Sequence, residues 1–224
     1  MEKESRMLRL RAFGPLACFT RPEFKVERMS YEVMTPSAAR GLLEAVLWKP
    51  AIRWRIHRIH VLRDIRFTSF KRNEVNGGRP AITAGQVAGE EPLRPFFVDE
   101  ARAQRSTLAL ADVDYVVEAT LRLTERAGED DNVNKFTEMF ERRLEKGQWF
   151  HAPYFGCREF AASIEPAAAS FQPILVTKPL GLMLHDIDFG PTGHGTPHFF
   201  QAVLRDGVVE VPPFEPRARA EDTR

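Results

Sequence analysis

The chain has 224 residues, enough for one large domain or two small ones around a hydrophobic core. Its hydrophobic content of 43% and charged content of 28% are ordinary for a soluble globular protein, and no apolar run approaches the roughly 20 residues that span a bilayer. The net charge is only +1, but residues 1–80 hold 17 Lys and Arg against 8 Asp and Glu, whereas residues 81–224 hold 15 against 23. We therefore expect the basic part to face a polyanion and the acidic part to face protein neighbours.

Cysteine and arginine usage narrows the class further. Cys18 and Cys157 form neither a disulfide framework nor a metal-ligand motif, and the N-terminal residues lack the apolar segment of a secretory signal, so we expect a reducing cytoplasm. Arginine outnumbers lysine by 25 to 7. The guanidinium group of arginine makes bidentate hydrogen bonds to phosphate and stacks on bases, which favours RNA as the polyanion. A GC-rich genome would produce the same ratio.

The first predicted elements are a strand and a helix. Residues 7–19 begin with alternating apolar and polar residues and predict a strand that is broken at Gly14 and Pro15. After a polar, basic connection, Thr35 precedes a proline, which is typical of a helix start because threonine caps the first amides and proline fits the first turn. Apolar residues at helical spacing then predict a short helix over residues 36–48.

The next segment, residues 51–67, alternates clearly and predicts a second strand. Its apolar face and its basic face consist, respectively, of Ile52, Trp54 and Ile56 and of Arg53, Arg55 and His57. Residues 73–95 are rich in glycine and proline and predict a mobile loop or a long hairpin arm outside the core.

A third strand and a second helix follow. Alternation over residues 113–125 predicts the strand, and Asn132 is a suitable N-cap for a helix that Gly147 closes. The apolar stripe of this helix consists of Val133, Phe136, Met139, Phe140 and Leu144. We expect a further strand within residues 158–165 or 180–189.

The order β-α-β-β-α-β predicts an α+β fold, with a ferredoxin-like (RRM-like) domain over residues 1–150. Such a domain presents one open sheet face, which often holds single-stranded RNA. Residues 151–224 end in apolar runs joined by an Asp-Gly turn at 206–207, and predict a small β-rich C-terminal domain.

Candidate catalytic groups are few. The sequence has no phosphate-binding loop, zinc-protease helix or hydrolase nucleophile elbow. His57 and His60 lie near the polar side of the basic strand, but their spacing places them on opposite faces of that strand. We therefore expect no metal site and no cofactor.

Basic and aromatic residues alternate through the first third of the chain. Because rings stack on bases while cations meet phosphates, this pattern favours RNA binding over a merely solvated face. The predicted RNA-binding residues are Arg21, Lys25, Arg28, Arg53, Arg55, Lys71 and Arg72, with Phe19, Phe24 and Phe70 between them.

One long segment resembles a known family. The run ACFTRPEFKVERMSYEVMTPSAARGLLEAVLWKPAIRW is similar to the N-terminal half of the type I-C CRISPR-associated Cas-five subunit, variant d (also called c). The resemblance continues in order through KRNEV, VDYVVEA, NKF, YFGCREF, LGLMLHDIDF and AVLRDGVVEVP, and so covers nearly the whole chain.

The resemblance implies a function and partners. A subunit of this family recognises the repeat hairpin of the precursor CRISPR transcript, cuts at its 3′ base without metal, and stays on the 5′ handle of the guide RNA. There it caps the Cas-seven backbone and contacts the large Cas-eight subunit of the surveillance complex, which meets target DNA. No membrane partner is expected.

The family's cleavage site is a tyrosine, a lysine and a histidine. At these positions this sequence has Leu47, Lys135 and Phe136, so one of the three is retained. Leucine and phenylalanine transfer no protons, and both fall on apolar stripes, so the catalytic apparatus has either decayed or moved. Tyr31 and His57 are the first candidates to substitute for the lost groups. Other candidates are His60, His151 and Tyr154.

Three functions follow from these residues. The first is a guide-RNA-processing endoribonuclease in which Lys135 stabilises the transition state. The second is a non-catalytic scaffold that caps the guide RNA. The third, a DNA-directed nuclease, lacks the carboxylates that would hold its metal. The region near residues 73–110, flanked by basic residues, is expected to act as a thumb over the handle RNA.

Overall fold

The computed structural model describes residues 4–24, 26–76, 82–92, 96–188 and 195–214. Its helices there are α1 (Pro36–Val46), α2 (Ala84–Ala88) and α3 (Val133–Glu145). Its strands there are β1 (Leu8–Ala17), β2 (Arg28–Met29), β3 (Ile52–Val61), β4 (Phe67–Val75), β5 (Arg102–Leu123), β6 (Ser163–Pro166), β7 (Lys178–Asp188), β8 (Thr196–Arg205) and β9 (Val208–Glu210).

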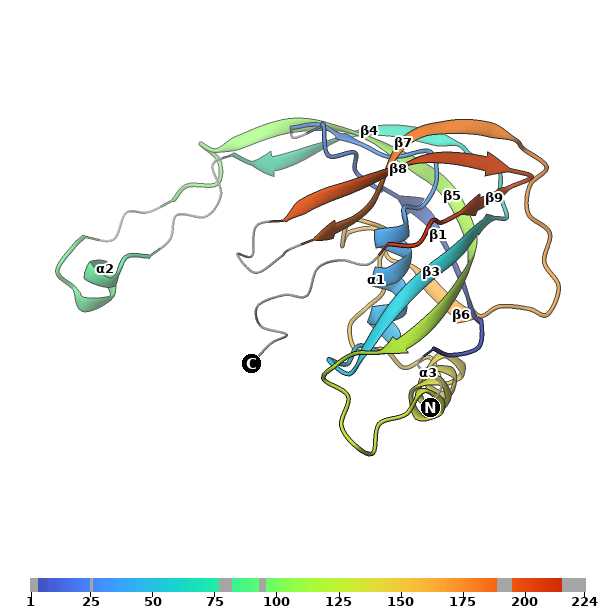
Figure 1. Cartoon of the computed structure of the whole chain (residues 1–224). Helices are drawn as coiled ribbons and strands as arrows, with labels where there is room; N and C mark the ends of the chain where they lie inside the picture. Colours follow the sequence, from blue (N-terminus) through green and yellow to red (C-terminus); the bar gives the residue numbers. More distant parts are fainter. Residues whose placement is uncertain (1–3, 25, 77–81, 93–95, 189–194, 215–224) are drawn as a thin grey trace.

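The strands form one mostly antiparallel sheet in the order β6-β1-β5-β3-β9-β8-β7. Two further strands lie off this row: β4 is antiparallel to β5, and β2 pairs with β5 in parallel. The second half of the chain joins the sheet through β9, which pairs with β3. Figure 1 shows α1 in the middle of the curved sheet and α3 at one end, near the N-terminus. The mixed α and β composition and the antiparallel sheet agree with the sequence.

Both main helices begin where the sequence predicts. Thr35 caps α1 by accepting a hydrogen bond from the amide of Ala38 at 3.3 Å, and Asn132 caps α3 by accepting from the amide of Lys135 at 2.9 Å. The apolar stripe of α3 packs under the sheet, with the ring of Phe140 4.8 Å from that of Trp54. This contact puts α3 on the apolar face of β3.

The first strand differs from its prediction, because β1 is not broken at Gly14 and Pro15. It keeps its register with β5 on both sides of that pair, from Gly14 opposite Val113 to Leu16 opposite Ala111. Its pairing with β6 ends at Phe13, so beyond that residue one side of β1 is unpaired and tolerates a proline as an edge strand does.

The described part of the glycine- and proline-rich segment, residues 73–76 and 82–92, belongs to a hairpin arm, one of the two structures expected for it. Strand β4 pairs with the first half of β5 from Phe67 opposite Leu110 to Val75 opposite Arg102, so β5 starts earlier than the predicted residues 113–125. Figure 1 shows the arm reaching away from the body with α2 at its far end. None of the residues of α2, all of which are described, is buried.

The C-terminal region contains both of the strands between which the sequence left a choice. One is β6, which lies beside β1, and the other is β7, which pairs with β8. The Asp-Gly turn between β8 and β9 is confirmed: Asp206 and Gly207 have φ of 47° and 75°, as a tight hairpin turn requires. A Cβ on Gly207 would lie 2.3 Å from the carbonyl oxygen of Ile174, so a larger residue is excluded.

Candidate nucleic-acid interface

Lys135 is a solvent-accessible cation in the first turn of α3. Its side chain is 44% exposed, its Nζ lies 2.9 Å from Oδ1 of Asp131, and it sits 5.6 Å from the ring centroid of Phe136. This ion pair, helped by the amide of Gly128, lowers the pKa of Asp131. An exposed lysine held by one carboxylate is available to an incoming phosphate, which can replace that carboxylate.

The other two positions at which the sequence resemblance implied catalytic groups are core positions. Leu47 is 0% exposed and Phe136 is 3% exposed. The backbone of Leu47 is used as well, since its carbonyl oxygen accepts a hydrogen bond from Nε1 of Trp54 at 3.0 Å. Neither side chain can take part in proton transfer, and both contribute to packing.

Tyr31 does not lie beside Lys135. It is 1% exposed, and its hydroxyl oxygen accepts a hydrogen bond from the amide of Leu184 at 3.2 Å; burial raises its pKa. Tyr31 precedes the N-terminal end of α1. Lys135 lies near the other end, because the charge of Lys49, just beyond the C-terminal end of α1, lowers the pKa of Asp131, the partner of Lys135. The 11 residues of α1 span roughly 16 Å between these two places.

His57 lies on the opposite face of the sheet from α3. Its Nε2 is 2.8 Å from Oγ1 of Thr120 and 3.9 Å from the carboxylate of Glu4. Burial, followed by the positive charge of Arg55, lowers its pKa. Because Trp54 contacts α3 and side chains alternate along β3, His57 points away from Lys135.

His60 is 9% exposed, and its ring packs 5.0 Å from that of Phe171. Burial lowers its pKa despite the carboxylate of Glu118, 3.5 Å from its Nε2. A β-bulge between Ile56 and Arg58 puts His60 on the same side of the sheet as Arg58 and Glu118. This is also the side of His57, so the prediction that the two histidines lie on opposite faces was wrong.

The sheet face that carries His57 is filled by ion pairs. Glu118 is 2% exposed and bonds Arg9 at 2.8 Å and Arg58 at 3.1 Å, while Arg11 bonds Asp114 at 2.7 Å. These three arginines therefore have carboxylate partners within the chain, which reduces the positive potential that they offer to RNA.

The structure brings together two of the predicted RNA-binding arginines. Arg28 and Arg72, on β2 and β4, share two carboxylates. Arg28 lies 3.4 Å from Glu74 and 3.0 Å from Glu159; Arg72 lies 2.9 Å from Glu74 and also bonds Glu159. The backbone of Arg21 lies beside β2, since its amide donates to the carbonyl oxygen of Met29 at 2.9 Å. Its guanidinium does not join the shared carboxylates and lies 4.8 Å from the ring centroid of Tyr31.

The other predicted RNA-binding residues do not join this cluster. Arg53 lies opposite Arg122 of β5, whereas Arg72 lies opposite Arg105. These two positions are about 55 Å apart along β5, at roughly 3.3 Å per residue, so Arg53 and Arg72 lie at different ends of that strand. Arg55 lies 3.8 Å from Glu4, Lys71 is exposed on the arm, and Lys25 lies outside the described residues.

The two cysteines lie next to the arginine cluster. The sulfur of Cys157 is 3.2 Å from Nη1 of Arg28 and 3.7 Å from Oγ1 of Thr20, which also lies 3.6 Å from the sulfur of Cys18. A hydrogen bond from the Cys18 thiol, together with Thr20 and Arg28, lowers the pKa of Cys157 despite partial burial. The sequence indicated no role for this thiol.

A row of aromatic rings runs beside α1; the sequence indicated two of its members, His151 and Tyr154, as single candidates but not the row. The rings of Trp48, Phe150, His151 and Tyr154 follow one another at centroid distances of 6.4, 6.2 and 6.0 Å. The amide of Phe150 donates to the carbonyl oxygen of Ala45 at 2.6 Å, which ties this aromatic row to α1. The clustering of rings in WFHAPYF, just after α3 ends, was the available signal.

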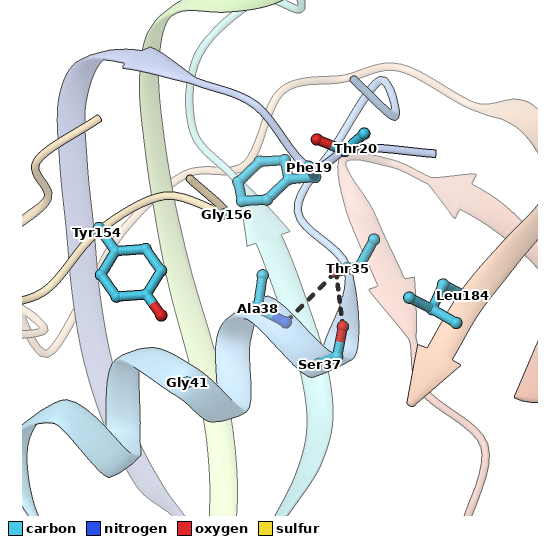
Figure 2. Close-up of a pocket in the computed structure, with 9 residues that line it drawn as sticks. All are labelled: Phe19, Thr20, Thr35, Ser37, Ala38, Gly41, Tyr154, Gly156 and Leu184. Atoms are coloured by element: carbon cyan, nitrogen blue, oxygen red, sulfur yellow. Dashed lines mark hydrogen bonds between the residues drawn. The ribbon is translucent and has the colours of Figure 1, made fainter. Parts of the chain in front are cut away.

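The aromatic row leads to a pocket at the start of α1 (Figure 2). The pocket has a volume of about 280 Å³ and lies between Phe19, Tyr154, Leu184 and the first turns of α1. The hydroxyl of Tyr154 points towards α1 in Figure 2. Gly41 also lines the pocket, and a Cβ built on it would meet no heavy atom within 4 Å among the described residues.

Neither a metal site nor a membrane helix is found in the described part of the chain. No group of three or more His, Cys, Asp or Glu residues is placed there to hold a metal ion. No described helix is long and apolar enough to cross a bilayer.

Comparison with known proteins gives consistent results. A family model described as CRISPR-associated protein (Cas_Cas5), of the Cas5d type, matches residues 7–212. Two similar proteins, from Mannheimia succiniciproducens and Thermus thermophilus, are each named CRISPR pre-crRNA endoribonuclease Cas5d. The first is 47% identical over 92% of this chain and 95% of its own length, and the second is 43% identical over 92% and 91%.

The fold is also similar to that of a solved structure, described as a CRISPR-associated protein. The two superpose with a TM-score of 0.69 at 21% identity, covering 95% of each chain.

Proposed function

The chain belongs to the Cas5d family of CRISPR-associated proteins, and we propose that it is an endoribonuclease that binds the repeat of precursor CRISPR RNA and cuts it. The observation that carries this proposal is the match, over nearly the whole of both chains, to relatives named for that activity. Exposed Lys135, retained where the family has its catalytic lysine, adds a group suited to the reaction.

The proposed reaction needs no metal. The 2′-OH of the nucleotide at the cut attacks the adjacent phosphorus, the bond from phosphorus to the 5′ oxygen breaks, and the products are a cyclic phosphate and a 5′-OH. One proton leaves the 2′-OH and one reaches the 5′ oxygen. Lys135 stabilises the charge of the phosphorane once the phosphate has displaced Asp131 from its ammonium group.

For the proton transfers we propose His151. His151 is exposed, and its ring lies 6.2 Å from that of Phe150 in the aromatic row. The first ring of this row, Trp48, directly follows Leu47, the position at which the resemblance implies a catalytic tyrosine. An imidazole is the side chain best suited to proton transfer near neutral pH. Tyr31 and His57, the first candidates from the sequence, lie at the far end of α1 and on the opposite sheet face.

The second candidate function is a non-catalytic cap on the guide RNA. It is favoured by the complete burial of Leu47 and near-complete burial of Phe136, which leave two of the family's three catalytic positions without a titratable group. In either case we propose that the protein acts in the cytoplasm, stays on the 5′ handle, and meets Cas-seven and Cas-eight subunits, with target DNA reached through the complex.

We also propose a domain division for this function. Residues 1–150 would form a ferredoxin-like RNA-binding domain and residues 151–224 a small β-rich domain. The order β6-β1-β5-β3 supports a ferredoxin-like arrangement, because two βαβ units interleave in that way in such folds. Its fourth strand, β6, lies at residues 163–166, so this order favours a boundary after β6 over one at residue 150. The arm of β4 and β5 supports a thumb over the RNA.

The test is cleavage of a labelled repeat RNA in EDTA, with binding measured in parallel. Wild type is expected to cut, whereas Lys135→Ala and His151→Ala are expected to bind and not cut. His57→Ala is the matched control, since that histidine lies on the other sheet face, and it should cut like wild type. Tight binding without any cleavage by wild type would establish the cap and overturn the nuclease.

A further inference from the structure

The aromatic row is exposed in a way that points to a ligand. Trp48 is 50% exposed and Phe150 is 67% exposed, and their rings are neighbours. Large rings rarely gather on a surface without a binding partner. A row of rings at successive positions suits a single nucleic acid strand, because each base presents a flat face on which a ring can stack.

The row ends in a space that the fold leaves unfilled. Tyr154 is both the last ring of the row and a wall of the pocket. Gly41, in the interior of α1, also lines the pocket. Alanine at this position would make a more stable helix. Close packing does not require this glycine, since a Cβ there would meet no described heavy atom within 4 Å. Its absent side chain therefore keeps the pocket open.

The lining of the pocket suits a base better than a phosphate. None of the described residues that line it is charged, and Thr35 already caps the first turn of α1 by accepting from Ala38. Tyr154 contributes a ring and Ser37 a hydroxyl, while Phe19, which is 2% exposed, closes one wall. The volume of about 280 Å³ is at the lower end of ligand pockets, which favours one ring system over a peptide segment.

We propose that this pocket seats one unpaired base of the bound RNA, while the neighbouring nucleotides lie over the aromatic row. The proposal rests on the proposed RNA-binding function and adds the place where a single-stranded part of the repeat RNA is held. Unpaired nucleotides are the ones available to it, because their bases can be splayed out and stacked on rings.

The experiment combines a series of repeat RNAs, each lacking one base, with the variant Gly41→Leu, which fills the pocket. In wild type, loss of the seated base should weaken binding by about 5- to 150-fold, the range for one stacked base. In Gly41→Leu the intact RNA should be weakened by a similar factor, and loss of that same base should cause little further change. Glu145→Leu, which places the same side chain at an exposed position near the end of α3 and outside the pocket lining, is the control and should bind as wild type does.

Other outcomes separate the two proposals. If wild type binds no repeat RNA at all, the proposed function fails. If wild type binds RNA but each missing base weakens binding of Gly41→Leu as much as it weakens binding of wild type, the base pocket is wrong while the function stands. If Gly41→Leu abolishes binding of free nucleoside monophosphates but leaves RNA binding unchanged, the pocket serves a free nucleotide and the proposal is again overturned. Unchanged RNA binding together with lost association of a protein subunit would identify the surface as a protein interface and overturn it too.

Discussion

Lys135 and Phe136 are adjacent in α3 and lie in opposite environments, the lysine 44% exposed and the phenylalanine 3% exposed. The ammonium group lies 5.6 Å from the ring centroid of its neighbour. The helix therefore uses one residue to fix its position in the core and the next to present a cation at the surface. Of the adjacent lysine and histidine that the sequence resemblance implies for the cleavage site, this chain has the lysine, and that residue is the one at the surface.

Replacing Lys135 with alanine should slow cleavage much more than it weakens binding. Loss of one group that stabilises transition-state charge typically lowers the rate by about 10²–10³, and loss of one phosphate contact reduces the slope of log affinity against log salt by about 1. Single-turnover cleavage in EDTA and a salt titration of binding measure the two effects. Equal losses in rate and affinity would mean that the lysine only binds.

Restoring a histidine by Phe136→His should destabilise the protein and not speed the reaction. The side chain is in the core, so removing its packing and burying an imidazole should cost about 2–4 kcal/mol. Glu138→His, on the exposed side of the same helix, is the control and should change the stability by less than about 0.5 kcal/mol. Urea denaturation measures both, and a cleavage assay would reveal any gain that contradicts the prediction.

Two glycines should respond in opposite directions to alanine. Gly41→Ala should stabilise the protein by about 0.5–1 kcal/mol, because the helix gains propensity and the added methyl group has room. Gly156→Ala should destabilise it by more than about 1 kcal/mol, because Gly156 has φ of 78° and a Cβ would lie 2.1 Å from the carbonyl oxygen of Cys18. Thermal or urea unfolding of both variants makes the comparison. Destabilisation by Gly41→Ala would show that the space beside α1 is not open.

Cys157 should react with iodoacetamide faster at neutral pH than an ordinary cysteine. Its lowered pKa means that the thiolate persists below the usual value near 8.5, and reactivity should fall only as pH drops through the lowered value. Removing the contact by Arg28→Ala should raise that midpoint, and buried Cys18 should stay unlabelled in the folded protein. Mass spectrometry after timed alkylation at several pH values measures both sites.

The sign of the linked stability effect follows. A lowered pKa in the folded state stabilises the fold above the unfolded pKa, and this contribution is lost as pH falls through the folded value. Cys157→Ser should therefore flatten that part of the stability profile. An alkylation midpoint at the ordinary cysteine value would remove the basis for both expectations.

Shortening the arm should affect function and not folding. Since no residue of α2 is buried, replacing residues 77–95 with a short turn should leave the unfolding midpoint nearly unchanged. Assembly of the guide-RNA complex should weaken if the arm acts as a thumb on the RNA. An unchanged assembly yield, measured beside an unchanged melting temperature, would rule out that role.

Much of the local structure could be predicted from the sequence. Helix starts at Thr35 and Asn132 depend on a side chain bonding an amide three residues on, and the turn at Asp206 and Gly207 depends on backbone preference alone. The apolar stripe of α3 likewise predicted that Phe136 is core. These features involve neighbours in the chain, so composition and spacing determine them.

The tertiary structure alone decided which distant groups meet. Arg28 and Arg72 share Glu159, and His57 lies away from Lys135, because strand pairing and register set those distances. The predicted break of β1 at Pro15 was wrong because a strand accepts a proline where its neighbour no longer pairs with it. In β1 that depends on where pairing with β6 ends, which the local sequence does not encode. The aromatic row and the pocket at Gly41 were missed for the same reason: they arise where α1 meets a segment roughly 100 residues later in the chain, and that contact depends on packing of the whole sheet.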